Sequence, residues 1–71
     1  MSKYTVFIEP AATGYSAYVP DLPGCVAAGS TLDETRRLMK EAIEFHIEGM
    51  RMHGEVVPEP TPHVEQIEVV A

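Results

Sequence analysis

Hydrophobic and polar positions alternate along the first part of the chain, in short segments separated by Pro and Gly. Alternation with β-branched and aromatic residues predicts β-strands. The predicted strands are residues 4–9 (YTVFIE), 15–19 (YSAYV) and 25–28 (CVAA). In the first, Tyr4, Val6 and Ile8 share one face, while Phe7 makes the other face apolar too. Because a strand with two apolar faces is usually buried on both sides, we expect it inside the sheet.

A different period follows, with apolar residues recurring every three or four positions over residues 31–53. This period predicts one amphipathic helix. Thr31 and Glu34 form a T-x-x-E capping box at its start, and Gly54 is expected to end it. Gly49 lies on the apolar side, where a close backbone approach would explain it. The apolar stripe is wide; it comprises Leu32, Leu38, Met39, Ala42, Ile43, His46 and Met50, flanked by Phe45, Ile47 and Met52.

The remaining residues predict a linker and a last strand. Three prolines in residues 56–62 (VVPEPTP) exclude regular structure, and residues 64–71 (VEQIEVVA) read as a strand with Ile67 and Val69 inward. We therefore expect an α+β fold of order β-β-β-α-β, with one helix packed on a four-stranded mixed sheet. The last strand should return parallel to the third and lie beside the first. Residues 1–71 are expected to form one domain.

The stretch YVPDLPGC, residues 18–25, interrupts this alternation. Pro20 ends a strand, Pro23 and Gly24 fix a turn, and Asp21 can accept hydrogen bonds from local backbone N–H groups. The only cysteine, Cys25, follows directly. A reactive thiol needs a cationic neighbour or a helix N-terminus, and the local sequence has no cation. The stretch is therefore interpreted as a stiff corner with a buried cysteine.

Composition narrows the function. The formal net charge is −6, which argues against nucleic-acid binding and favours a basic partner or simple solubility. The single cysteine and three histidines lack zinc-ligand spacing, so no metal or cofactor is expected. No nucleophile with a base and no phosphate-binding glycine loop is present, so we expect no enzyme. The absence of a signal peptide or apolar span indicates the cytoplasm.

Several motifs together resemble the HicB antitoxin family. They are Gly14-Tyr15-x-Ala17-Tyr18-Val19-Pro20-Asp21-Leu22-Pro23-Gly24-Cys25, Gly29-x-Thr31-Leu32-x-Glu34, Glu41-Ala42-Ile43 and Gly54-x-x-x-Pro58-x-Pro60. The resemblance implies a truncated ribonuclease-H-like fold. It also implies an antitoxin that masks a HicA-like toxin, a small basic ribonuclease that cleaves messenger RNA. Many HicB proteins add a C-terminal DNA-binding segment; none is evident here, so DNA binding is not expected.

Two sets of surface residues are predicted. An acidic set that would face the basic toxin comprises Asp21, Glu41, Glu44 and Glu48, and a competing acidic set on the C-terminal segment comprises Glu59, Glu65 and Glu68. An apolar set expected to join copies into a dimer or tetramer comprises Phe7, Tyr18, Phe45 and Val70. Self-association is expected because so small a domain buries little apolar surface. The open alternative is a solitary homo-oligomeric module that is structural or binds a small ligand.

Overall fold

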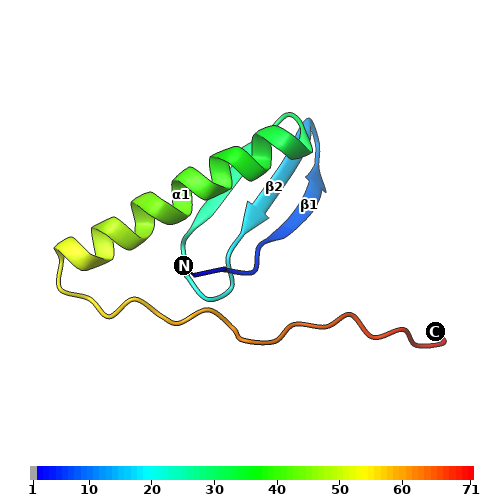
Figure 1. Cartoon of the computed structure of the whole chain (residues 1–71). Coiled ribbons are helices and arrows are strands. Elements are labelled where there is room, and N and C mark those ends of the chain that lie inside the picture. The colour runs from blue at the N-terminus through cyan, green and yellow to red at the C-terminus, as the bar shows by residue number, and fades with distance from the viewer. Residues whose placement is uncertain (1) are drawn as a thin grey trace.

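The computed structural model describes residues 2–71 and places one helix over a three-stranded antiparallel sheet (Figure 1). The strand order is β1-β2-β3, so β2 is central. The elements are β1 (Phe7–Ala11), β2 (Gly14–Tyr18), β3 (Val26–Gly29) and α1 (Leu32–Met52). The helix contacts β2 and β3, which leaves β1 less covered than the other strands. The predicted α+β class and the order of the first four elements are confirmed, but the first strand begins at Phe7 and not at residue 4.

The first hairpin corrects two predictions. β1 and β2 pair from Phe7↔Tyr18 to Ala11↔Gly14, so the turn is Ala12–Thr13 and Pro10 belongs to the strand. Proline is tolerated there because β1 is an edge strand, where a missing N–H breaks no ladder bond. The expectation that the first strand lies inside the sheet is therefore wrong. Phe7, the apolar residue on the second face of β1, stacks on Tyr18 across the hairpin, with ring centroids 5.5 Å apart.

The core lies between the sheet and the helix. Alternation puts Ala17 and Val19 of the second predicted strand on the helix side, where both are buried, while Ser16 and Tyr18 are exposed. The buried hydrophobic residues are Ala17, Val19, Leu22, Cys25 and Met39, and Tyr4, Val6, Ile8, Ala27, Ala42, Ile43, Ile47 and Met50 pack around them. The faces predicted for the first strand and much of the helical stripe are thus confirmed.

Both ends of α1 are capped as predicted. At the start, Thr31 Oγ1 accepts a hydrogen bond from the Glu34 N–H at 3.0 Å, and Glu34 Oε1 accepts one from the Ser30 N–H at 2.7 Å. At the end, Gly54 has a φ of +72°. The Gly54 N–H donates to the Arg51 carbonyl, and the Glu55 N–H donates to the Met50 carbonyl. These two hydrogen bonds form a Schellman motif. The helix direction is therefore fixed at both termini.

Two glycines have different surroundings. A Cβ atom built on Gly29 would lie 2.7 Å from Thr35 Oγ1 and 2.9 Å from the Thr35 N, so only glycine fits where β3 meets α1. Thr35 is fully buried, and its hydroxyl donates to the Thr31 carbonyl at 2.7 Å. Sequence reasoning missed Thr35, because it left this polar residue out of the apolar stripe. Around Gly49, by contrast, a Cβ atom would meet nothing within 4 Å, so no close approach explains that glycine.

The C-terminal segment, residues 55–71, contains no helix or strand. It runs beneath the sheet and continues beyond the folded body (Figure 1). The predicted linker without regular structure is confirmed, but the fourth strand over residues 64–71 is not formed within this chain. Ile67 and Val69, expected inward, are 79% and 73% exposed. The sheet is consequently antiparallel throughout the described residues, and both of its edges are open.

Candidate partner-binding site

The corner at residues 18–25 is closed by three backbone hydrogen bonds. The Leu22 N–H donates to the Val19 carbonyl at 3.1 Å, the Cys25 N–H donates to the Leu22 carbonyl at 3.0 Å, and the Val19 N–H donates to the Cys25 carbonyl at 3.2 Å. Leu22 is fully buried, and Gly24 has a φ of +85°, a value that favours glycine. The predicted stiff corner is confirmed, and the buried Leu22 fixes it to the core.

Cys25 belongs to this core. Its side chain is 3% exposed, and burial raises the pKa of its thiol. Since the thiolate is the reactive form, a raised pKa lowers reactivity at neutral pH. The interpretation of Cys25 as a small buried hydrophobe is confirmed.

Asp21 ties the C-terminal segment to the corner. Its carboxylate accepts hydrogen bonds from the Thr61 N–H at 2.7 Å and from Thr61 Oγ1 at 2.7 and 2.8 Å. These bonds to the Thr61 hydroxyl and backbone lower the pKa of Asp21. A second tether lies three residues earlier, where Tyr4 Oη donates to the Pro58 carbonyl at 2.6 Å. The carboxylate that the sequence assigned to a partner is therefore already engaged inside the chain.

The three predicted helix glutamates lie together on one side of α1. Glu41, Glu44 and Glu48 are all exposed, and spacings of three and four residues keep them on neighbouring turns. Glu41 pairs with Arg37 at 3.1 Å, whereas Glu44 and Glu48 form no ion pair with another described residue. We call these three residues the helix glutamate stripe.

Asp21 does not join that stripe. The corner residues Leu22 and Pro23 face the helix at His46 and Met50. His46 is two positions from Glu44, and two positions correspond to about 200° around a helix. The four acidic residues predicted as one partner-binding set therefore occupy two separate surfaces, and His46 lies at the helix–corner boundary.

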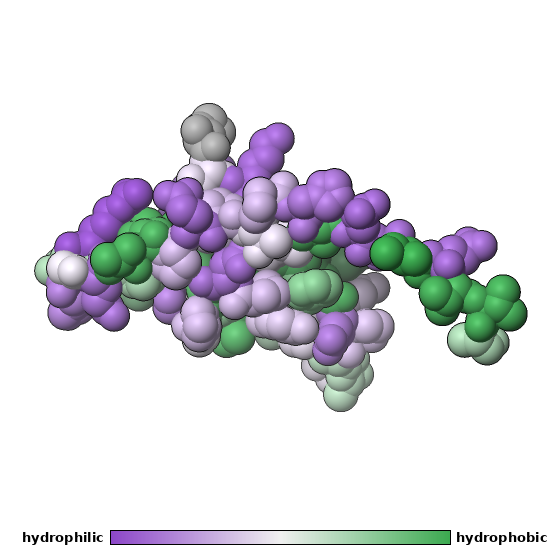
Figure 2. All heavy atoms as spheres, turned by 90° about the horizontal axis from the view of Figure 1, so that it is seen from below, coloured by the Kyte–Doolittle hydropathy of each residue, from purple (hydrophilic) through white to green (hydrophobic). Residues whose placement is uncertain are grey.

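The predicted apolar set is also divided. Phe7 pairs with Tyr18, and Tyr18 with Val26, so these three exposed side chains form a row across the sheet face opposite the helix. Phe45 is 80% exposed on the helix, away from that row. Val70 is exposed on the C-terminal segment, and Figure 2 shows hydrophobic groups gathered where this segment projects from the body. Sequence reasoning missed Val26, because it predicted a strand over residues 25–28 without assigning its faces.

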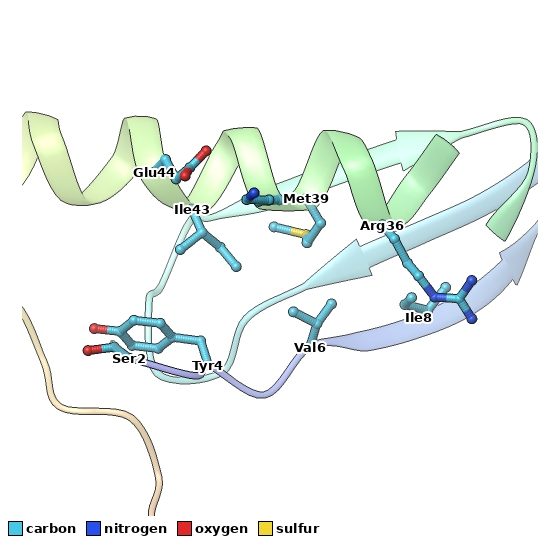
Figure 3. A pocket seen from close by; sticks show the side chains of 9 residues that line it. Ser2, Tyr4, Val6, Ile8, Arg36, Met39, Ile43 and Glu44 are labelled. Carbon is cyan, nitrogen blue, oxygen red and sulfur yellow. The ribbon is translucent and has the colours of Figure 1, made fainter. Parts of the chain in front are cut away.

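A groove opens between the first strand and the helix (Figure 3). Its volume is about 390 Å³, and its lining residues are Ser2, Tyr4, Val6, Ile8, Arg36, Met39, Lys40, Ile43 and Glu44. Val6 and Ile8 form one wall, and Met39 and Ile43 form the other. The groove exists because α1 lies over β2 and β3 and leaves the helix-facing side of β1 partly bare. Sequence reasoning missed it, since it expected a fourth strand beside the first.

Residues 2–71 contain neither a metal-binding cluster nor a helix able to span a membrane. No group of three or more His, Cys, Asp or Glu side chains in this range could hold a metal ion. The helix in the described residues is not long and apolar enough to cross a membrane.

Comparison with known proteins gives the family. Residues 4–70 match the family described as HicB-like antitoxin of bacterial toxin-antitoxin system. A protein of Haemophilus phage HP1, an uncharacterized 14.9 kDa protein in the rep-hol intergenic region, is 49% identical over 89% of this chain. The chain spans about half of that relative, 47% of its length. A UPF0150 protein of Thermoplasma acidophilum is 44% identical over 79% of this chain and 83% of its own length.

A solved structure agrees with this. One chain of a HicA3 and HicB3 toxin-antitoxin complex superposes with a TM-score of 0.75 and 33% sequence identity. The match covers 84% of this chain and 70% of that one. Because the family match extends over almost all the elements described above, from before β1 to the C-terminal segment, the chain belongs to the HicB-like antitoxin family.

Proposed function

We propose that this chain is an antitoxin that binds a HicA-like, mRNA-cleaving ribonuclease toxin and masks its active site. The observation that carries the proposal is the structural match, at 33% identity, to one chain of a toxin-antitoxin complex. The net charge of −6 supports a basic partner independently. Under this proposal the protein acts in the cytoplasm by occupying a surface, and it catalyses no reaction itself.

The helix glutamate stripe is the best-placed acidic surface for such a partner. α1 is capped at both ends, so the stripe is held in place before binding, and a preorganised surface loses less entropy on association. Arg37 pairs with Glu41, whereas Glu44 and Glu48 form no ion pair with a described residue, with Lys40 and Arg51 close to them. Asp21 contributes differently in this proposal, as the anchor that holds Thr61 and the segment around it in position.

Reversing one charge on the stripe tests the surface. Charged groups at an interface rim act mainly on the association rate. Glu48→Lys should slow association with a catalytically inactive HicA-like partner by about threefold to tenfold at low salt. The difference should shrink at high salt, because salt screens exposed charges. Surface plasmon resonance at several salt concentrations measures both effects.

Glu9→Lys is the matched control. It makes the same charge change on the sheet face opposite the helix, where Phe7 is exposed. It should leave the association rate nearly unchanged. Equal slowing by both variants would show that only the net charge matters, and would reject the stripe. The absence of any binding to a HicA-like protein encoded beside this chain would reject the antitoxin function and favour the solitary module.

A further inference from the structure

We propose that the segment 64–70 of one copy adds as a fourth strand to the open edge of β1 in a second copy, and that the exchange is reciprocal. In this arrangement Ile67 and Val69 fill the groove between the first strand and the helix. The interface requires no toxin, although Glu44 of the helix glutamate stripe also lines this groove.

The first support is the unfilled groove at an open sheet edge. Val6, directly before β1, and Ile8, within it, are only half-buried, and α1 leaves a groove of about 390 Å³ beside them. A strand placed next to β1 would lie under the overhanging helix and would centre α1 over a four-stranded sheet. Unpaired edge strands readily take up an added strand, because their outward N–H and C=O groups lack partners. Pro10 removes a donor near the end of β1, which confines pairing to the part around Val6 and Ile8.

The second support is the shape of the segment 64–70. It is extended, and its alternation puts Ile67 and Val69 on one side and Gln66 and Glu68 on the other. It is exposed throughout, with Val70 fully so. Burying these exposed β-branched side chains in an apolar groove would be favourable. The apolar residues of the groove are Val6, Ile8, Met39 and Ile43.

The third support is charge. The rim of the groove carries Arg36 and Lys40, two of the five basic residues in a chain with eleven acidic ones, beside a single acidic residue, Glu44. Lys40 forms no ion pair with another described residue, whereas Arg36 pairs with the exposed Asp33. On the segment 64–70, Glu65 shares the side of Ile67 and Val69 that would face the groove, and the segment carries no basic residue. Basic side chains on an otherwise acidic protein thus stand where an acidic strand would lie.

The occupant is a second copy because the tethers direct the segment away from its own groove. Pro58 is held at Tyr4, which precedes β1, but three residues later Thr61 is held at Asp21, in the corner after β2. The segment therefore crosses the end of the sheet and does not follow the edge of β1. Beyond Thr61 it leaves the body, as Figure 1 shows. Reciprocal exchange about a two-fold axis fills both grooves and covers both segments in one closed assembly.

Val69→Ser tests the contact, with Val56→Ser as its matched control. Val69 is 73% exposed and Val56 is 88% exposed, so neither substitution should disturb the core. In multi-angle light scattering the unaltered chain should have twice the mass of one chain at tens of micromolar. Val69→Ser should raise the dimer dissociation constant at least tenfold, while Val56→Ser should leave it unchanged. Circular dichroism should show the same folded body in all three.

A mixed-label experiment identifies the occupant. In a sample that combines isotope-labelled and unlabelled chains, isotope-filtered nuclear Overhauser effects should connect Ile67 or Val69 methyl groups with Val6 or Ile43 of the other copy. The same contacts seen only within one copy would show that the chain fills its own groove, and would overturn the proposal. A monomeric mass would also overturn it. So would a dimer indifferent to Val69→Ser, which would assign the interface to the Phe7, Tyr18 and Val26 row.

Discussion

At the scale of single residues, Cys25 carries a free thiol that is buried in the core. It is 3% exposed, and burial raises its pKa. We expect a thiol reagent such as 5,5′-dithiobis(2-nitrobenzoic acid) to modify folded protein at pH 7 at least 100-fold more slowly than protein unfolded in urea. The absorbance of the released thiolate measures both rates. Rapid modification of the folded protein, with circular dichroism unchanged, would contradict this burial.

Two glycines make a matched pair for stability. Gly29→Ala places a Cβ atom against the backbone and hydroxyl of Thr35, so it should lower the free energy of unfolding by about 1–3 kcal/mol. Gly49→Ala fills open space in a helix, so it should raise that free energy by about 0.5–1 kcal/mol. Urea denaturation followed by circular dichroism measures both. Equal effects of the two substitutions would contradict the different surroundings described above.

At the scale of elements, the bond between Asp21 and Thr61 predicts a pH-dependent tether. The pKa of Asp21 is lowered from 3.8 in the folded chain, so the tether is complete above that pH and is lost as the pH falls through the lowered value. The Thr61 amide resonance should therefore shift with a midpoint below pH 3.8. In Asp21→Asn this shift should be absent. A Thr61 amide that responds to acid in the same way in the unaltered chain and in Asp21→Asn would refute the tether.

Elements whose signals are local could be predicted from the sequence. The helix was predicted to within a residue because Thr31, Glu34 and Gly54 fix its ends through contacts within one turn. The corner was predictable because Pro20, Pro23 and Gly24 each restrict the backbone locally. The distance between Asp21 and Glu48 could not be predicted, since it depends on how the corner packs against the helix. The hydrogen bonds between Asp21 and Thr61 join residues forty positions apart, so no local sequence pattern predicts them.

At the scale of the whole molecule, the fourth strand shows the limit of a pattern. Alternation in residues 64–71 indicates which side chains can share a sheet face, but it does not identify the chain that supplies the neighbouring strand. The prediction placed that strand beside β1 of the same chain, where the structure instead has an open edge and a groove. In the proposed exchange, the alternating segment still lies beside β1 as predicted, but a second copy of the chain supplies it.

Exchange between copies makes thermal stability depend on concentration. A partner that binds only the folded state raises the unfolding midpoint by mass action. For a dimer well above its dissociation constant, each tenfold rise in concentration adds about 0.7 kcal/mol per chain, which is about 3–6 °C for a domain of this size. Differential scanning calorimetry at 10 and 100 μM should show this rise for the unaltered chain and for Val56→Ser. Val69→Ser should show a smaller rise, because less of it is dimeric. A midpoint independent of concentration in the unaltered chain would mean that each copy unfolds alone, and that the groove has no partner among copies of this chain.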